Sequence, residues 1–430
     1  MTAIGRMRSL GVAWCCLVCL PIHAAAQDLA QPQLVREVLA GTRDEARVSW
    51  WGFDAEDSTR FLQDAIQSKA RKLIIDRQAT PWITRPLTGV SNQEIILEEG
   101  VELVAKKGDF RAKGDCLLSF RGCENVTIRG EKKGSAKPAR IRMHKKDYQS
   151  DAYEKSEWRH GLVFLGCRRV LVRDLAIEET GGDGIYLGAG PNKNPNLDVV
   201  IRRVDCNRNH RQGISVISAE NLLIEDCLLR NTQGTAPESG VDFEPNNPYD
   251  LLVNCIMRNC VAENNAGRGY EICPQSMNSG SKPVSIHLDK CVSRKNKLHG
   301  IHLCSAQKDP PGGLLRITHF LSEEDGMAGL SVQFNPYDAI RIEMEDTVIR
   351  DSAQEDSFFA PIYVQGIESD DRPTGNLHFK RVTIKDDKDR PFFKINDRKG
   401  NGLRDITGEI VLERGGRKET IKMETWLSGG

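Results

Sequence analysis

The sequence predicts an all-β chain folded as a right-handed parallel β-helix with an N-terminal capping helix. Short runs of similar sequence recur every 23 to 32 residues, and each opens with Gly or a small substitute and continues with alternating apolar residues. Two further columns repeat in the same register, one of Asn or Asp and one of Cys. Coils of this length, each holding several short strands, are typical of a solenoid in which every coil contacts its neighbours.

Residues 1–26 are expected to be a cleavable secretory signal peptide. Arg6 and Arg8 precede the apolar stretch 10–22, and three alanines follow before Gln27. This order of basic, apolar and small residues is typical of an export signal, and the apolar stretch is short for a membrane span. We therefore expect a secreted or periplasmic protein.

The charges of the chain are balanced. Lys plus Arg and Asp plus Glu both number 60, and removal of the signal leaves 58 basic against 60 acidic residues. This balance gives no reason to expect a nucleic-acid partner, and no segment is long and apolar enough to predict a membrane span. The oligomeric state stays open.

The chain after the signal divides into a lead-in at 27–50, the β-helix at 51–404 and a C-terminal strand or cap region at 405–430. A capping helix is expected from about Asp54 to Ala70, with Asp54 as its N-cap and an apolar stripe along one face. A strand at 72–75 should follow it. The segment at about 131–160 interrupts the coil pattern and is expected to form a loop closing one end of a binding site.

The repeat alignment predicts which residues stack in neighbouring coils. The aligned runs open at Gly161, Gly184, Gly213, Gly240, Gly269, Gly300, Gly329 and Pro361. Asn209, Asn265, Asn296 and Asp325 each precede their glycine by four positions, and we expect them to bond between coils and to adopt the left-handed backbone of a bend. Cys206, Cys227, Cys260 and Cys291 follow β-rich runs, and we expect stacked thiols in the core.

Two of these patterns carry a resemblance to a known family. The opening from Phe53 to Ile66 and the coils of the form Asp-Cys…Asn…Gly-Ile resemble the pectin-lyase-like superfamily of right-handed parallel β-helix proteins, over about residues 50–400. The resemblance implies the fold. It leaves the reaction open, because this superfamily includes lyases, hydrolases, epimerases and phage-tail binding proteins.

A group of charged side chains should lie on the outer face of the aligned strands. Strand alternation points Asp242 and Glu244 outward, and Glu271 occupies the neighbouring coil about 4.8 Å away. Adjacent carboxylates repel, so at least one pKa should rise and give an acid that can donate a proton near neutral pH. The alternative is a solvated strand whose carboxylates are neutralised by basic neighbours. Substrate-binding roles are predicted for Asp183, Tyr186, Gln212, Arg268, His299, His302, and for Trp158, Arg159 and His160 at one end.

Three functions fit this group. A glycoside hydrolase acting on a poly- or oligosaccharide would use Asp242 and Glu271 as its central pair, with Glu244 modulating or replacing one of them and no cofactor. A polysaccharide lyase would hold Ca²⁺ through the same three carboxylates, with Arg268, His299 or Lys297 as base or clamp. A non-catalytic carbohydrate-binding solenoid is the third. Because acidic groups outnumber basic ones here, we favour hydrolysis.

Two cysteine pairs occupy equivalent positions on neighbouring coils. Cys273 aligns with Cys304, and Cys123 aligns with Cys167. In an oxidising compartment either pair could form a disulfide if the Cβ atoms approach to about 3.5–4.5 Å, and stacked free thiols are the alternative.

Overall fold

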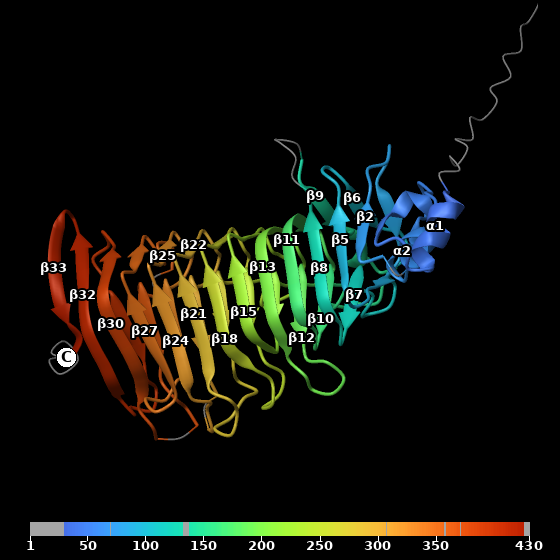
Figure 1. The fold of residues 1–430 in the computed structure, drawn as a ribbon. Helices are drawn as coiled ribbons and strands as arrows, with labels where there is room; N and C mark the ends of the chain where they lie inside the picture. The colour runs from blue at the N-terminus through green and yellow to red at the C-terminus, as the bar shows by residue number, and fades with distance from the viewer. Residues whose placement is uncertain are drawn as a thin grey trace, which may run out of the picture.

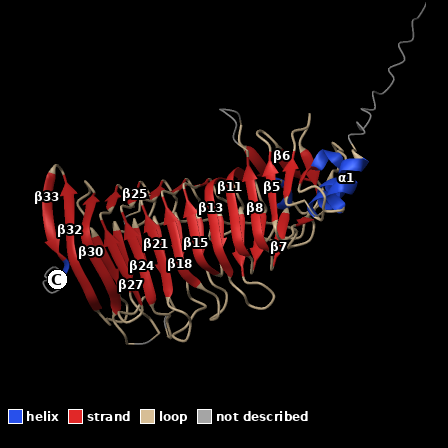
Figure 2. Cartoon of the chain, in the orientation of Figure 1, coloured by secondary structure: helices blue, strands red, loops and turns tan. Residues whose placement is uncertain are grey.

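The computed structural model describes residues 30–68, 70–131, 137–306, 308–356, 358–369 and 371–424, so the expected signal peptide lies outside the described residues. An elongated right-handed parallel β-helix confirms the predicted fold class (Figure 1). The helices α1 and α2 lie at one end of the solenoid and the β32–β33 hairpin lies at the other (Figures 1 and 2). Strands form one 22-stranded and one 11-stranded sheet.

The N-terminal cap holds two helices where the sequence predicted one. Helix α1 spans Pro32–Leu39, and α2 spans Thr59–Ile66 with Ser58 at its N-cap. The predicted helix at 54–70 was too long, because the Asp54 carboxylate accepts hydrogen bonds from the backbone N–H groups of Glu56 and Asp57 and forms a turn instead. Leu62, Ala65 and Ile66 of α2 are buried against the first coils.

The 11-stranded sheet contains the aligned runs in the predicted register. Asp242 pairs with Glu271, and Glu271 pairs with His302. Two N-terminal strands, β4 and β7, were missed by the alignment. The strands are β4 Leu87–Thr88, β7 Leu118–Arg121, β10 Leu162–Leu165, β12 Ile185–Gly188, β14 Ile214–Val216, β17 Val241–Phe243, β20 Tyr270–Ile272, β23 Ile301–Cys304, β26 Leu330–Gln333, β29 Ile362–Gln365 and β31 Phe393–Asn396.

The 22-stranded sheet forms the other walls of the solenoid. Its strands are parallel except for β33, which runs antiparallel to β32 across the predicted 405–430 region. They are β1 Glu45–Arg47, β2 Lys72–Ile75, β3 Trp82–Thr84, β5 Gln93–Leu97, β6 Glu102–Ala105, β8 Glu124–Gly130, β9 Ala139–Arg142, β11 Arg168–Glu178, β13 Asn196–Asn207, β15 Ala219–Glu225, β16 Leu228–Arg230, β18 Leu252–Arg258, β19 Val261–Glu263, β21 Val284–Asp289, β22 Val292–Arg294, β24 Gly313–Thr318, β25 Leu321–Glu323, β27 Ile340–Glu345, β28 Val348–Arg350, β30 Thr374–Lys385, β32 Leu403–Arg414 and β33 Arg417–Lys422.

The predicted insertion at 131–160 is partly an ordinary coil. Strand β9 pairs with β6 and β11 in the larger sheet, so residues 139–142 belong to the solenoid wall. The short helix α3, Lys145–Tyr148, opens the part that leaves the wall. The loop that leaves the coils therefore comprises residues 143–160, and we refer to it as the 143–160 loop.

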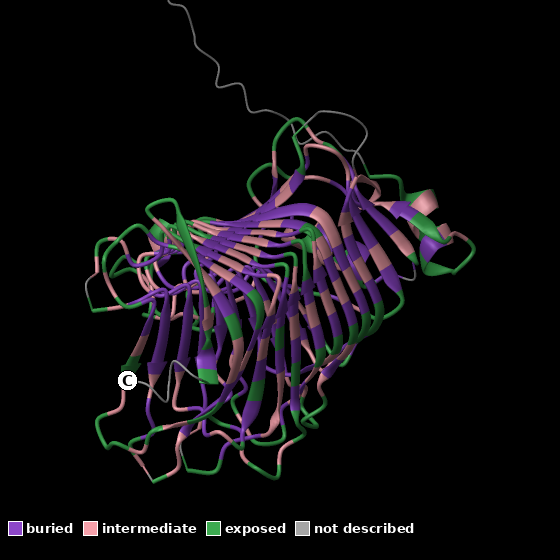
Figure 3. Ribbon diagram, turned by 90° about the vertical axis from the view of Figure 1, so that its left-hand side faces the viewer, coloured by how far each residue is buried: buried purple, intermediate pink, exposed green. Residues whose placement is uncertain are grey.

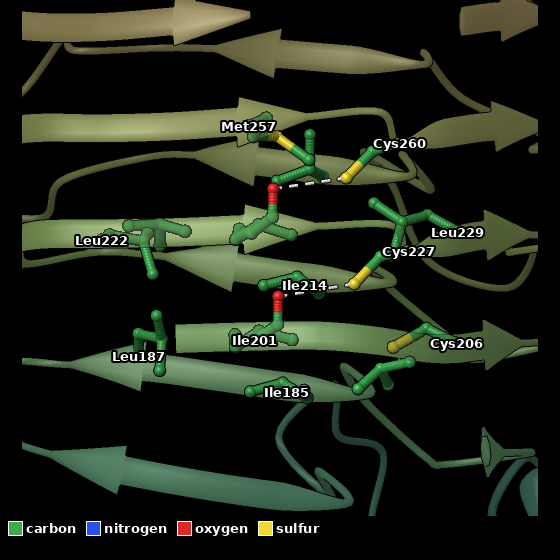
Figure 4. Packing of buried hydrophobic residues seen from close by; sticks show 14 of the residues in the cluster. Ile185, Leu187, Ile201, Cys206, Ile214, Leu222, Cys227, Leu229, Met257 and Cys260 are labelled. Carbon is green, nitrogen blue, oxygen red and sulfur yellow. Dashed lines mark hydrogen bonds between the residues drawn. The ribbon is translucent and has the colours of Figure 1, made fainter. Parts of the chain in front are cut away.

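Side chains that point into the solenoid form one continuous apolar core, in which buried residues follow one another along neighbouring strands (Figure 3). The cysteine column lies in this core, as predicted. Cys206, Cys227 and Cys260 stack between Leu and Ile side chains of successive coils (Figure 4). The Cys260 thiol donates to the Ile224 carbonyl oxygen at 3.4 Å, so these thiols act as small core groups.

The asparagine column forms the predicted ladder between coils. Asn265 Nδ2 donates to Asn296 Oδ1 at 2.8 Å, and Asn296 Nδ2 donates to Asp325 Oδ1 at 2.9 Å. The predicted left-handed backbone was misplaced by one residue, since the positive φ angles belong to the preceding residues, Asn264 and Lys295, both at 54°. The residue with the positive φ angle makes the bend, and the side chain of the residue after it points inward. That inward side chain forms hydrogen bonds with buried backbone groups.

Candidate functional site

Two columns of outward side chains contact each other along the 11-stranded sheet. One column holds the residue just before each glycine, and the other holds the middle residue of each strand. Gln212 Nε2 donates to Asp242 Oδ2 at 2.9 Å, and Ser239 Oγ donates to Glu271 Oε2 at 2.7 Å. Each contact joins one coil to the next, so the predicted site residues form one continuous group rather than separate solvated side chains.

Asp242 is fully buried beneath this group. Desolvation raises the pKa of its carboxyl well above the usual range, and the nearby Glu271 and Glu244 carboxylates raise it further. Its Oδ1 accepts no hydrogen bond within the described structure, whereas Glu244 is placed to accept one from the protonated carboxyl. The environment of Asp242 therefore favours its neutral, proton-donating form.

Glu271 lies one coil away and has different hydrogen-bond partners. It is 4% exposed, and its Oε1 accepts a hydrogen bond from Arg268 Nη1 at 3.0 Å while Ser239 binds its Oε2. Asp242 and Glu271 are thus neighbouring carboxyl groups in different surroundings. Asp242 has an oxygen that accepts no hydrogen bond in the described structure, whereas Glu271 is bound by Arg268 and Ser239.

Arg211, which the sequence analysis missed, links the carboxylates to the 143–160 loop. Its Nη2 donates to Glu244 Oε2 at 2.8 Å, its Nη1 lies 4.0 Å from Asp183 Oδ2, and its Nε lies 3.7 Å from Glu157 Oε2. These acidic neighbours raise the pKa of Arg211 despite its burial. Its position two residues before Gly213 was the available signal, because that position also recurs in every coil.

Asp183 and His160 form a second buried pair at the N-terminal end of the site. His160 Nδ1 lies 3.2 Å from Asp183 Oδ2 and accepts a hydrogen bond from the Asp183 backbone N–H at 2.9 Å. Burial raises the pKa of Asp183 to about 7 and lowers that of His160 to about 3. The imidazole stacks on Tyr186 at 4.7 Å, and burial raises the pKa of this phenol to about 12.

His299 and His302 form a stacked pair at the other end, with ring centroids 5.2 Å apart. Desolvation and the nearby Arg268 lower the pKa of His299 to about 3 and that of His302 well below its usual range. Both imidazoles are therefore neutral near pH 7. Phe359, which the sequence analysis did not single out, packs edge-on against His299 at 5.0 Å.

The structure contradicts a substrate contact by Arg159. This residue is fully buried, and its guanidinium donates to the backbone carbonyls of Phe110, Arg111 and Glu154. It also lies over the Tyr148 and Tyr153 rings. Because these interactions occupy the guanidinium within the protein, Arg159 holds the 143–160 loop in place.

Trp158 lies in the same loop but is 50% exposed. It lines a pocket of about 510 Å³ together with Glu157, Lys155, Lys113, His210 and Thr235. The lining combines residues of the 143–160 loop with residues of the coils, among them His210 and Thr235. Since Glu157 also faces Arg211, the pocket adjoins the N-terminal part of the site. A tryptophan at the mouth of such a pocket can stack on an apolar ligand face.

Of the carboxylates that the lyase alternative would use to hold Ca²⁺, which are Asp242, Glu244 and Glu271, Glu244 accepts a hydrogen bond from Arg211 and Glu271 accepts one from Arg268. The group with metal-ligand atoms within 4.8 Å of one another consists of Cys273, His302 and Cys304.

All ten described cysteines are thiols, including both pairs proposed as disulfides. A hydrogen bond from the Cys273 thiol lowers the pKa of Cys304, and a hydrogen bond from Cys167 lowers that of Cys123. The two thiols of each pair are therefore in contact, as their equivalent positions on neighbouring coils predict.

Comparison with known proteins agrees with this architecture. The family model described as the right-handed beta helix region matches residues 118–310. Over these residues the match agrees with the parallel β-helix seen in the structure. No helix of the described chain is long and apolar enough to cross a membrane.

Two solved structures illustrate the shared fold. The A-module of the mannuronan C-5 epimerase AlgE6 of Azotobacter vinelandii superimposes with a TM-score of 0.58 at 13% identity, covering 86% of this chain and 92% of that one. A tailspike protein of E. coli bacteriophage HK620, in complex with a hexasaccharide, gives a TM-score of 0.60 at 11% identity over 86% and 65% of the two chains.

Among curated sequences, the uncharacterized SPbeta prophage-derived protein YorA of Bacillus subtilis is 26% identical over 273 residues, which are 56% of this chain and 45% of YorA. The uncharacterized YclG of the same organism is 30% identical over 115 residues, which are 24% of this chain and 20% of YclG. The chain thus spans less than half the length of these curated relatives.

Proposed function

We propose that this protein is an exported enzyme that hydrolyses glycosidic bonds in a poly- or oligosaccharide. The observation that carries the proposal is the pairing of Asp242 with Glu271 on neighbouring strands, one in surroundings that favour a neutral acid and the other bound by Arg268. Glycoside hydrolysis uses two such carboxyl groups. The mannuronan epimerase and the oligosaccharide-bound tailspike support a carbohydrate substrate through their shared fold, which leaves the reaction open.

In this mechanism Asp242 donates its proton to the glycosidic oxygen as the bond to the sugar carbon breaks. Glu271 either takes a proton from a water that attacks that carbon or attacks it directly and is later released by water. Glu244 has a side chain that is 37% exposed and lies against Asp242, so it connects the buried pair to solvent. Substrate binding at the pair would displace the Arg211–Glu244 contact, and Arg211 would then be free to bind the sugar.

One observation favours a second candidate, elimination from a uronate-containing polysaccharide. His299 is neutral and Arg268 is cationic beside Glu271, so this corner holds both a base and a group that could bind a substrate carboxylate. Elimination needs both roles. It differs from hydrolysis because its product carries a carbon–carbon double bond.

A panel of neutral, acidic and amino polysaccharides, monitored for both reducing ends and unsaturated-product absorbance, tests the proposal. We expect reducing ends without the absorbance. Both signals together would favour elimination, and neither signal across the panel would favour a carbohydrate-binding role.

The Asp242→Asn variant should lose at least 100-fold in kcat on the substrate found, since a positioned acid contributes about 10² to 10⁴. Asp205→Asn is the control, because Asp205 lies on the other sheet and pairs with Arg230. Full activity of Asp242→Asn would refute the assignment of the acid.

A further inference from the structure

A compact group of sulfur and nitrogen ligands lies beside the carboxyl pair. Cys273, His302 and Cys304 each offer one ligand atom, and these atoms all lie within 4.8 Å of one another. Cys304 ends strand β23, His302 lies two residues earlier on the same side, and Cys273 directly follows the neighbouring strand β20. Because β20 and β23 pair in parallel with Glu271 opposite His302, Cys273 lies opposite Cys304. Two adjacent strands therefore bring the three donors together.

The surroundings orient these donors. His302 Nδ1 lies 3.1 Å from Ser331 Oγ, and this hydrogen bond holds the ring in position. The Gln275 amide donates to the Cys304 sulfur at 2.6 Å. Partners of this kind typically hold metal ligands in position. His302 and Cys304 are buried whereas Cys273 is half-buried, so an ion can enter from the side of Cys273.

We propose that this protein binds one thiophilic cation, Zn²⁺ or Cu⁺, through Cys273, His302 and Cys304. Thiolate and imidazole ligands suit these ions, whereas Ca²⁺ and Mg²⁺ prefer oxygen ligands. Three protein ligands around Zn²⁺ leave a fourth position for water. The ion would lie close to Glu271, whose Oε1 is 3.4 Å from Cys273 Sγ. Metal binding here does not depend on the proposed hydrolysis, because the three donors are not among the carboxyl groups that this reaction uses.

Metal titration of the reduced, metal-free mature chain tests the site without a carbohydrate assay. Zn²⁺ binding is measured against a chromophoric chelator, Cu⁺ binding against a competing ligand under anaerobic conditions, and Co²⁺ binding by absorption. We expect one ion per chain, with a thiolate-to-cobalt charge-transfer band and the visible absorption of tetrahedral Co²⁺. The preference between Zn²⁺ and Cu⁺ identifies the cation.

Matched variants separate this site from the other thiols. Cys273→Ser, at the half-buried position, and His302→Gln should each weaken binding at least 100-fold. Cys116→Ser should leave it unchanged, because Cys116 is also half-buried but lies outside the group. Circular dichroism and thermal melting verify that each variant is folded.

Three results would overturn the proposal. One is uptake of less than one ion per chain by the reduced protein, and another is binding that survives Cys273→Ser. The third is a mapped Cys273–Cys304 disulfide in the exported protein, because denaturing, non-reducing thiol labelling after chelation should find both residues as thiols.

Discussion

Gln212 donates through Nε2 to Asp242 Oδ2 at 2.9 Å although the two residues belong to neighbouring coils. Its Oε1 accepts the backbone N–H of Ser239 at 2.8 Å, and Ser239 in turn donates to Glu271. A single buried amide therefore connects the proposed acid to the hydroxyl that holds the proposed base. The distance between Asp242 and Glu271 therefore depends on Gln212 as well as on the pairing of their strands.

Replacement of Gln212 by Ala should lower kcat on the substrate about 10- to 100-fold with a smaller change in KM, because Asp242 loses its orienting donor. The same change should cost about 1–3 kcal/mol of unfolding free energy, since a buried N–H loses its acceptor. Gln93→Ala is the control. Gln93 is equally buried and donates to two backbone carbonyls in the N-terminal coils, so it should cost stability without affecting kcat. An equal loss of kcat in both variants would show that Gln212 does not position Asp242.

Asp183→Asn should change how stability depends on pH. The pKa of Asp183 is about 7 in the folded protein and about 4 when unfolded, so between these values the folded state binds a proton that the unfolded state has lost. The contribution of Asp183 to the free energy of unfolding therefore falls as the pH rises from about 4 to 7. Asn does not titrate, so the variant lacks this fall.

The stability of Asp183→Asn relative to wild type should thus grow by up to about 1.4 kcal/mol per pH unit across this window. Urea unfolding at several pH values measures it. In the control, Asp205→Asn, the difference from wild type should stay within about 1 kcal/mol. A difference for Asp183→Asn that is constant from pH 4 to 7 would contradict the raised pKa.

Arg211→Ala should destabilise the protein by about 1.5–3 kcal/mol, because Glu244 loses a charge-assisted hydrogen bond and Asp183 loses a nearby cation. Arg208→Ala, three residues away, is the matched control. Arg208 is half-exposed and pairs with Glu179 at 3.1 Å, so its loss should cost no more than about 1 kcal/mol. Urea denaturation of both variants gives the comparison, and similar costs would mean that Arg211 is not the central cation of the site.

Trp158→Ala should raise KM about 10-fold and leave stability within about 0.5 kcal/mol, because the indole is half-exposed at the mouth of the pocket. A 10-fold change corresponds to about 1.4 kcal/mol, within the usual range for an aromatic contact. Leu39→Ala on the capping helix α1 is the control, since Leu39 is similarly exposed and remote from the pocket lining. An unchanged KM would place the substrate elsewhere on the sheet.

The sequence alone determined the solenoid, the register of its strands and the columns of outward side chains. Each coil of a solenoid pairs with the next, so an alignment of glycines such as Gly240 and Gly269 also fixes that Asp242 lies opposite Glu271. The cysteine stack and the asparagine ladder followed from the same repeat.

Tertiary structure decided what the repeat does not encode. The burial of Asp242, the bridging position of Arg211 and the internal role of Arg159 depend on contacts between non-equivalent residues. The local turn made by Asp54 likewise shortened the capping helix. Register is a property of neighbouring strands, whereas burial and charge pairing depend on contacts between non-equivalent positions, and the periodic pattern gives no information about those contacts.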